Sequence, residues 1–499
     1  MKMLSDPPEM PVGTGSPADA PVRTAIPRAS PLLIVADRGR IPAASGDTGV
    51  LFVTDEIFLP HRNGSSQIYT QVAQAYASAG WRTHCLSFYR DPAEVETPET
   101  IAAYREAFDC TLLAPGWNLG GTTTGRIGMG IREANRWLTG NVFASHKLLA
   151  ARHQAFQASL LTVVQEQRIA EIYFHKPHTM LLLEPLLGRL RPARFVLDLH
   201  DDFVARTEHY AAAYKSLFAS LPWRDILRQH RRMYLRHRLG RTDTARSRRH
   251  ELALLTRSDE VRTASDAEYQ RYVQFPALTR RVRHVPWRII QPADTAHRSN
   301  GARPFHAGFI GADSVMNLDA VIHLRDRILP RVRTLQPDFR MLIAGTLSRN
   351  VGPLLKGVAN VEVWPDLPDV ARFYDAIGVA AIPLRFGTGV SVKAIEALGY
   401  GCPVVTTPVG VRGIAGSLLR PDLVDITDDP SAFAATLVRR ATAPLPRTDG
   451  ASRPEGSFPE GSFPEGSFPE GSSPEGPSPQ GPSTPSPALA LPKVNACAT

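Results

Sequence analysis

The sequence predicts an α/β protein with two Rossmann-like domains. The chain has 499 residues, more than a single hydrophobic core usually organises. Buried strand patterns alternate with amphipathic helix patterns in two successive series, and parallel strands joined by helical crossovers are the simplest fold for such a pattern. The composition, 43% hydrophobic and 21% charged, is that of a globular protein.

Both ends of the chain are expected to lie outside the two domains. Residues 1–48 are rich in Pro and Ala and are predicted to form a loose extension, with one short strand at residues 31–38. Residues 446–499 repeat a five-residue unit that has Pro and Gly in every copy. Such a repeat buries too little apolar area to offset its conformational entropy, so we expect a disordered tail.

Residues 49–295 are predicted to form the first domain, beginning with a strand, helix and strand. The expected strands are 51–54, 80–89, 110–115, 171–175 and 194–200, and the expected helices are 65–79, 146–167 and 179–190. Residues 296–445 repeat the alternation and are predicted to form the second domain. Its expected strands are 304–311, 339–346, 361–367, 379–384 and 403–409, and its expected helices are 317–337, 371–377 and 392–401.

The segment PLRFGTGVSVKAIEA, residues 383–397, combines a glycine turn with positive charge at a strand end. Arg385 follows the strand, Gly387, Thr388 and Gly389 form the turn, and Lys393 lies one turn into the next helix. Glycines let backbone amides approach a ligand, and a helix N-terminus adds positive potential. The pattern therefore predicts a diphosphate site, although a helix-capping loop would look the same in isolation.

Glu396 follows Lys393 by three residues, so both side chains lie on one face of the helix. A carboxylate there is suited to accept hydrogen bonds from the two hydroxyls of a ribose. The pair extends the predicted site from a diphosphate to a nucleotide.

The stretch from Phe309 to Ile414 resembles the C-terminal half of glycosyltransferase family 4 enzymes, the glycosyl transferases of group 1. The resemblance implies the GT-B fold, in which two Rossmann-like domains face each other across a cleft. It also implies that Gly311, Gly387, Thr388, Gly389 and Glu396 bind the donor and that Arg385 and Lys393 are catalytic.

The first domain resembles the same family at two places. Gly64 corresponds to a loop glycine that lets the backbone approach the donor phosphates and the acceptor. The strand FVLDLHDDF ends as the family's strand does, which implies that His200 is a catalytic residue near the transferred sugar, with Asp201 beside it. His175 and His178 are interpreted as structural residues.

One position departs from the family pattern. Many members have two glutamates separated by seven residues, and the second corresponds to Glu396. The first would fall at position 388, which is Thr. A glycine-rich form of this loop also occurs in the family, and it would recognise the sugar hydroxyls largely through backbone amides.

The resemblance implies a hexosyltransferase that moves a sugar from a nucleotide-diphosphate sugar to an acceptor hydroxyl with retention of configuration. Neither a metal ion nor another cofactor is expected. The expected acceptor is a glycan or a lipid-linked sugar, in the biosynthesis of a cell-surface polysaccharide or glycoconjugate. A nucleotide-sugar epimerase of the same fold and a non-catalytic sugar-nucleotide-binding protein remain alternatives.

The formal charge of +9 is concentrated in residues 223–251, which contain ten arginines between Arg224 and Arg249. Apolar residues are interleaved with them, so the stretch could be an amphipathic helix on an anionic membrane. A solvated helix face is the alternative. Nucleic acid is not expected as a partner, because no recognition motif accompanies the arginines.

The remaining observations narrow the class of protein. No apolar run is long enough to span a membrane and no secretory signal is present, so a cytoplasmic location is expected, including the inner face of the membrane. Asp201 and Asp202 are neighbours on opposite faces of a strand, which argues against a hydrolase. The four cysteines have no metal or disulfide spacing and are interpreted as core or tail residues.

Overall fold

The computed structural model describes residues 33–37, 48–60, 64–89, 95, 97–115, 134–136, 138–143, 154–239, 242–287, 303–365, 367 and 370–443. All of these residues belong to one unit of the chain, Met1–Thr448. The predicted repeat tail, residues 446–499, lies outside the described residues, as does most of the predicted N-terminal extension. The predicted domain junction at residues 295–296 also lies outside them and stays a prediction.

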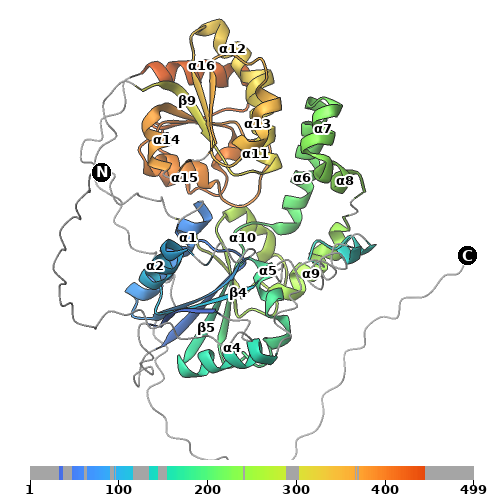
Figure 1. Cartoon of the computed structure of the whole chain (residues 1–499), viewed down its shortest axis with the longest axis vertical. Coiled ribbons are helices and arrows are strands. Elements are labelled where there is room, and N and C mark those ends of the chain that lie inside the picture. Colours follow the sequence, from blue (N-terminus) through green and yellow to red (C-terminus); the bar gives the residue numbers. More distant parts are fainter. Residues whose placement is uncertain are drawn as a thin grey trace, which may run out of the picture. The chain divides into compact units, whose positions relative to one another are not determined.

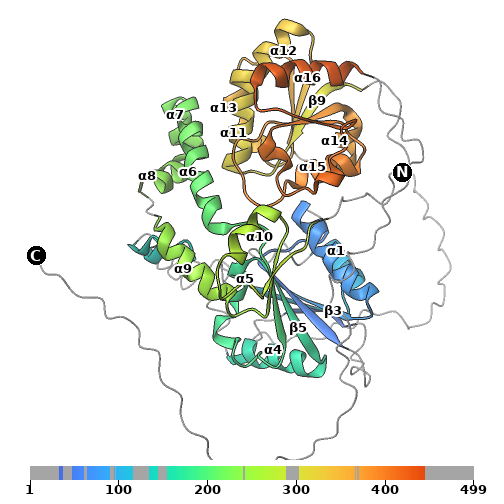
Figure 2. The same ribbon diagram turned by 180° about the vertical axis from the view of Figure 1, so that it is seen from behind.

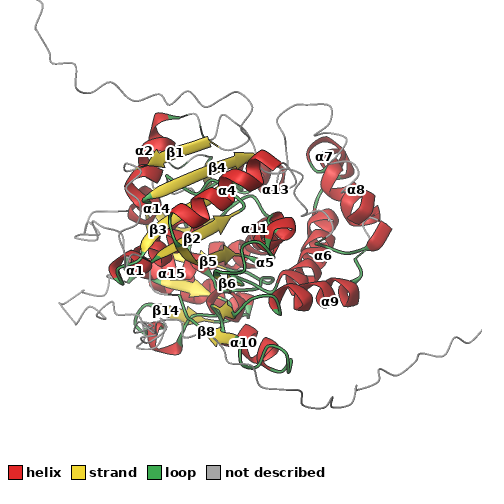
Figure 3. Cartoon of the chain, turned by 90° about the horizontal axis from the view of Figure 1, so that it is seen from below, coloured by secondary structure: helices red, strands yellow, loops and turns green. Residues whose placement is uncertain are grey.

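The first half of the described structure, residues 33–287, is built on an eight-stranded sheet with the strand order β1-β4-β3-β2-β5-β6-β7-β8 (Figure 3). Only β1 is antiparallel, and it pairs with β4. The strands are β1 Leu33–Asp37, β2 Gly49–Thr54, β3 Arg82–Tyr89, β4 Cys110–Pro115, β5 Ile169–His175, β6 Arg194–Asp198, β7 Glu260–Thr263 and β8 Val282–His284. Every residue of β2 is buried, as expected of a central strand in a parallel sheet.

The helices of the first half connect these parallel strands. They are α1 Gly64–Ser78, α2 Pro98–Ala107, α4 Gln154–Glu166, α5 Pro177–Leu182, the 3₁₀ turn Glu184–Leu186, α6 Phe203–Ser220, α7 Trp223–Gln229, α8 Arg231–Leu239, α9 Thr244–Leu255 and α10 Asp266–Val273.

The second half, residues 303–443, is built on a six-stranded sheet with the order β11-β10-β9-β12-β13-β14, in which all neighbours are parallel. Helices α14 and α15 lie on one side of β9, and α11 and α13 lie on the other (Figures 1 and 2). The strands are β9 Phe305–Ile310, β10 Met341–Ala344, β11 Val361–Trp364, β12 Ile377–Ile382, β13 Val404–Thr406 and β14 Val424–Ile426. The helices are α11 Val315–His323, the π-helical turn Leu324–Ile328, α12 Leu329–Leu335, α13 Ser348–Leu355, α14 Val370–Ala376, α15 Val392–Gly399, the 3₁₀ turns Pro408–Val411 and Gly416–Leu418, and α16 Pro430–Thr442.

The predicted fold class, an α/β protein with two parallel-sheet halves, is confirmed. Two helix predictions need correction. The stretch 223–251 is not one helix but three, since α7, α8 and α9 are separate. The expected helix 179–190 ends at Leu182, and a 3₁₀ turn that contains Pro185 follows it, because proline cannot donate the hydrogen bond that would continue the helix.

Helix α6 connects the strand end of β6 to the second half. Its residues Ala213 and Leu217 are fully buried in the hydrophobic core that also contains Leu318 and Val321 of α11. The chain that leaves the carboxyl end of β6 is therefore anchored in the core of the second half. Three of the four cysteines, Cys85, Cys110 and Cys402, are buried, which confirms their interpretation as core residues; Cys497 lies outside the described residues.

Candidate functional site

The predicted residues of the first half follow the carboxyl ends of its parallel strands. His200 comes two residues after β6, and Gly64 is the first residue of α1, the helix that follows β2. His200 has a φ of 52°, and Lys176, directly after β5, has a φ of 78°. Non-glycine residues rarely adopt this left-handed backbone, and where they do, a functional site is a common reason.

His200 belongs to a buried cluster with His175 and Asp198, which we call the His–Asp cluster. Its Nε2 atom lies 3.3 Å from Nδ1 of His175 and 3.5 Å from Oδ2 of Asp198. Burial lowers the pKa of His200 to about 3, and the charge of Lys176 adds to this effect. Burial also lowers the pKa of His175 well below its usual value. Both rings are therefore neutral at pH 7 and act as hydrogen-bonding groups.

The His–Asp cluster also has the residue types of a metal site. Each member offers one ligand atom, and these atoms all lie within 4.8 Å of one another. Neutral imidazoles and a carboxylate suit a divalent transition metal. The expectation that no metal is needed therefore stays a prediction.

His178 and Lys176 are tied to the loop after β2. His178 Nε2 lies 2.8 Å from Oδ2 of Asp55, and Lys176 Nζ lies 3.4 Å from Oδ1 of Asp55 and 3.3 Å from Oε1 of Glu56. Burial alone would lower the pKa of Lys176. The charges of Asp55 and Glu56 raise it, and their effect prevails, so the pKa lies well above its usual value. His175, which the sequence analysis interprets as a structural residue, lies in the same buried cluster as His200.

The predicted turn of the second half, Gly387, Thr388 and Gly389, is named the glycine loop. Gly389 has a φ of 67°, and a Cβ atom on it would press against the carbonyl oxygen of His200 and lie 2.8 Å from Cβ of Asp201. Only glycine permits both this backbone and this approach. The structure therefore brings the glycine loop directly onto the strand end that carries His200.

Two amides of the glycine loop are engaged by side chains of the first half, a difference from the prediction that they face a ligand. The Gly387 amide donates to Nδ1 of His209 over 2.9 Å, and the Gly389 amide donates to Oε1 of Glu268 over 3.1 Å. Neither partner was among the predicted site residues. These bonds occupy both amides, so neither amide is available to a ligand in this structure.

Arg385 is also placed differently from the prediction. Its guanidinium group forms a bidentate ion pair with Asp319 of α11, which is fully buried, and donates to the hydroxyl of Ser216 over 2.9 Å. Its charge is thus neutralised within the protein. In this geometry Arg385 joins α6 to the second half, and its catalytic role stays a prediction.

Lys393 and Arg412 form what we call the cation pair. Burial lowers the pKa of Lys393 to about 8, and Arg412 adds to the effect. Burial lowers the pKa of Arg412 to about 10. Within the described part of the chain, neither residue forms an ion pair, and the Arg412 guanidinium instead donates to the carbonyl oxygens of Thr388 and Val409. Two incompletely neutralised cations at one place favour an anion.

Two hydroxyl groups next to the cation pair are also suited to bind a ligand. The Oγ atoms of Thr388 and Ser391 are buried and have no hydrogen-bond partner among the described residues. Buried hydroxyls normally have partners, so an unpartnered one at a charged site is suited to bind a ligand oxygen. Thr388, which stands where the family's first glutamate was expected, thus contributes a polar group of its own.

The other two predicted residues of the second half have structural partners. Glu396 accepts a hydrogen bond from Tyr374 over 3.1 Å, and burial raises its pKa to about 7. Gly311 leaves no room for a side chain, because a Cβ atom would lie 2.8 Å from Nδ2 of Asn317. Binding of the donor by Gly64, Gly311 and Glu396 stays a prediction.

Residues 304–442 match the family model described as "Glycosyl transferases group 1". The chain carries a glycosyltransferase domain. This domain comprises β9 to β14 and α16, and it contains the glycine loop and the cation pair. The predicted class of enzyme, a glycosyltransferase, is confirmed for this domain.

Solved structures resemble the chain at low sequence identity. A glycosyltransferase from Rickettsia africae has 10% identity and a TM-score of 0.45, over 79% of this chain and 88% of the other. Sucrose-phosphate synthase from Thermosynechococcus elongatus has 15% identity and a TM-score of 0.46, over 80% and 95%. Anabaena HepE, solved with UDP and glucose, has 12% identity and a TM-score of 0.47, over 79% and 92%. No curated protein matches the sequence.

The glycosyltransferase domain alone does not contain every residue of the candidate site. His200, His209 and Glu268 come from the first half, outside the matched residues. Of the residues that the sequence prediction missed, Arg412 carried a local signal, since it follows a strand and a glycine, whereas Arg385 follows a strand and precedes a glycine turn. His209 and Glu268 carried none, because their positions depend on contacts between distant segments.

Proposed function

We propose that the protein is a retaining glycosyltransferase that moves a sugar from a nucleoside-diphosphate sugar to an acceptor hydroxyl, without a metal ion. The observation that carries the proposal is the cation pair beside the glycine loop, within a glycosyltransferase domain. The product would be a cell-surface polysaccharide or glycoconjugate.

The leaving group of this reaction is a nucleoside diphosphate, whose negative charge grows as the glycosidic bond breaks. Lys393 and Arg412 would stabilise this charge more strongly in the transition state than in the bound donor, which lowers the barrier. The hydroxyls of Thr388 and Ser391 supply two further donors. Because the two cations are already partly buried, less reorganisation of water is needed when the charge develops.

His200 would act on the transferred sugar as a neutral residue. Its pKa of about 3 excludes a role as a charged acid at pH 7, so its ring is suited to orient a sugar hydroxyl. The contact between its backbone and Gly389 keeps this ring near the leaving group.

A turnover assay tests the proposal. The purified chain is incubated with nucleoside-diphosphate sugars and candidate acceptors, and release of the nucleoside diphosphate is measured with and without acceptor. We expect acceptor-dependent release, and we expect Lys393→Ala to lower kcat by about 100-fold or more, as for loss of one donor to a developing anion. Full activity of this variant would refute the role of the cation pair.

The same assay separates the two alternatives. A nucleotide-sugar epimerase would convert the donor without forming a glycosylated acceptor. A non-catalytic protein would bind the nucleoside diphosphate, which raises the melting temperature, yet show no turnover with any donor.

We also propose that the acceptor is presented at an anionic membrane, through α7 and α8. The apolar side chains of Trp223, Leu227 and Leu235 are 55%, 44% and 45% exposed. The exposed arginines among them include Arg224, Arg228, Arg231 and Arg238. Exposed apolar groups interleaved with cations suit the interface of an anionic bilayer. No helix among the described residues is long and apolar enough to span a membrane.

Only α7 and α8 belong to the proposed membrane surface, and α9 does not. Arg248 of α9 pairs with Asp202 and Glu251 inside the protein, so it is not available to a membrane. Sedimentation with vesicles of phosphatidylcholine alone, or with phosphatidylserine added, tests the surface of α7 and α8. We expect binding only to the anionic vesicles and its loss in the variant Trp223→Ser with Leu227→Ser. Equal sedimentation with both kinds of vesicle would contradict it.

A further inference from the structure

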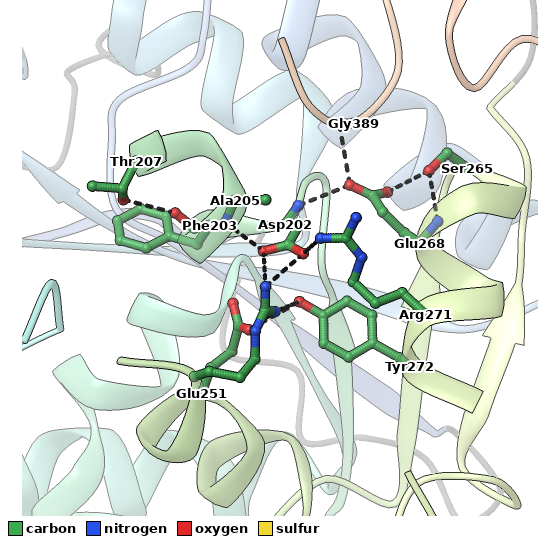
Figure 4. A network of polar contacts seen from close by, with 11 residues as sticks. Asp202, Phe203, Ala205, Thr207, Glu251, Ser265, Glu268, Arg271, Tyr272 and Gly389 are labelled. Carbon is green, nitrogen blue, oxygen red and sulfur yellow. Dashed lines mark hydrogen bonds and ion pairs between the residues drawn. The ribbon is translucent and has the colours of Figure 1, made fainter. Parts of the chain in front are cut away.

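Glu268 lies at the contact between the glycine loop and the first half, and its carboxylate joins three separate segments (Figure 4). Its Oε1 atom accepts hydrogen bonds from the amides of Asp202 and Gly389, over 2.8 and 3.1 Å. Its Oε2 atom accepts from the hydroxyl of Ser265 over 2.7 Å. The side chain is only 5% exposed.

The local sequence would normally direct this carboxylate elsewhere. Ser265 is the N-cap of α10 and accepts from the Glu268 amide over 3.3 Å, so the sequence Ser-Asp-Ala-Glu has the pattern of a capping box. In a capping box the glutamate reaches back to the amide of the N-cap residue. Here Oε1 is turned to Asp202 and Gly389 instead, so the capping glutamate serves a contact between distant segments.

Asp202, the second partner of Glu268, is itself held firmly. Its carboxylate caps α6 at the Ala205 amide over 2.8 Å, and it pairs with Arg248 over 2.9 Å and with Arg271 over 2.6 Å (Figure 4). Two ion pairs and a cap fix the backbone of Asp202, so the Glu268 carboxylate has a rigid base. From this base it reaches Gly389, which lies directly against the backbone of His200.

Glu268 is also close to the cation pair. The charges of Asp201 and Glu268 both act on Arg412 and oppose the lowering of its pKa by burial. The carboxylate therefore lies in the same electrostatic environment as the groups that would bind the leaving diphosphate.

We propose that Glu268 is a positioning residue for sugar transfer: it holds the Gly389 amide against the strand end of β6 and so sets the distance between His200 and the cation pair. This inference rests on the proposed function. It assigns to Glu268 no contact with the substrate. Its effect is on the geometry of the glycine loop, and displacement of such a loop by about 1 Å can cost about 100-fold in rate.

The test compares Glu268→Ala with Glu268→Gln in the full chain. Alanine removes the acceptor of both amides, whereas glutamine keeps an oxygen for them and offers an amide group to Ser265. We expect Glu268→Ala to lower kcat by about 10- to 100-fold with a smaller change in KM for the donor, and Glu268→Gln to restore kcat to within about threefold of the wild type.

Glu251→Ala is the matched control. Glu251 is also buried, and it belongs to the same network through Arg248 and Tyr272, but it makes no contact with the glycine loop. It should lower the melting temperature without lowering kcat. An equal loss of kcat in Glu251→Ala and Glu268→Ala would mean that general destabilisation is the cause and would overturn the inference.

Amide hydrogen exchange of the peptide 384–391 gives a readout that does not depend on catalysis. We expect faster exchange in Glu268→Ala than in the wild type, in Glu268→Gln and in Glu251→Ala. Unchanged exchange would overturn the inference. Failure of the proposed function would look different, because the wild type itself would then show no turnover while the exchange pattern of the variants persisted.

Discussion

At the scale of single residues, the candidate site depends on how each cation is neutralised. Arg385 is paired with the buried carboxylate of Asp319, whereas Lys393 and Arg412 have only distant or carbonyl partners. Burial without pairing is what lowers their pKa values, and binding of an anion would reverse this effect.

The pKa of Lys393 predicts a pH dependence of nucleoside-diphosphate binding. Its value of about 8 means that Lys393 is charged at pH 7 and mostly neutral at pH 9. Since an anion raises this pKa, affinity should be constant below pH 8 and then fall by up to about tenfold per pH unit. Titration calorimetry with UDP, GDP and ADP at pH 7 and pH 9 measures it. The fall should be smaller in Lys393→Arg, and an equal fall in both proteins would assign it to another group.

Arg385 should behave as a structural residue. Arg385→Ala leaves the fully buried carboxylate of Asp319 unpaired, and we expect the free energy of unfolding to fall by about 2 kcal/mol. The cost is smaller than for a fully buried pair because the Arg385 side chain is 38% exposed. Urea denaturation measures this loss. Affinity for nucleoside diphosphates at 10 °C should be unchanged, and a large loss of affinity would restore the role that the sequence predicted.

The residues of the site were predictable to different degrees. Lys393 and the glycine loop could be predicted because a strand, a glycine turn and a helix are close in the sequence. The ion pair of Arg385 could not, since Asp319 is 66 residues away. Glu268 could not be predicted as a site residue because the sequence Ser-Asp-Ala-Glu, residues 265–268, is explained by helix capping alone.

At the scale of elements, the glycine loop is the part of the second half that meets the carboxyl end of β6. Gly389 is strained for any other residue by its φ of 67° and by the backbone of His200. Gly401 has a similar φ of 60° but open space around its Cβ position. Substitution of Gly401 therefore measures the cost of the left-handed backbone alone, whereas substitution of Gly389 adds the cost of a steric clash.

Alanine at these two glycines should give different results. Gly401→Ala should cost about 1 kcal/mol of stability from its backbone conformation alone, with normal kcat. Gly389→Ala should cost more and should lower kcat by at least about 100-fold, because the loop has to move away from His200. Thermal unfolding and steady-state kinetics check both, and a Gly389→Ala variant with normal kcat would show that this contact is not needed.

The element predictions failed at two helices, the apolar stretch 179–190, which Pro185 interrupts, and the charged stretch 223–251. The expected strand 51–54 and helix 65–79 correspond to β2 and α1 within a few residues. The stretch 223–251 was predicted as one helix, but α7 ends at Gln229 and α9 starts only at Thr244, after its N-cap Asp243. Ten arginines suit an exposed helix, but they do not reveal where it is interrupted.

At the scale of the whole molecule, buried histidines link stability to pH. His84 in β3 is 1% exposed, neither of its ring nitrogens has a hydrogen-bond partner among the described residues, and burial lowers its pKa to about 4. The unfolded chain binds a proton at this residue below pH 6.5, whereas the folded chain does not, so stability falls as the pH decreases from 6.5 to 4.

His84→Leu should remove this contribution. Between pH 7.5 and pH 5, the wild type should lose about 2 kcal/mol more of its free energy of unfolding than the variant does. Urea denaturation at the two pH values measures the difference. His84 is in the interior of the first sheet and is not part of the candidate site, so kcat at pH 7.5 should be normal. An equal loss in both proteins would show that His84 does not titrate on unfolding.

The central claim is that Lys393 and Arg412 together bind a diphosphate, and titration calorimetry with UDP, GDP and ADP at pH 7 tests it most directly. The wild type and Arg385→Ala should bind at least one of these nucleotides with similar affinity. The variant with both Lys393→Ala and Arg412→Ala should bind it at least about 100-fold more weakly while its unfolding remains cooperative. Equal affinity in the double variant and the wild type would contradict the account.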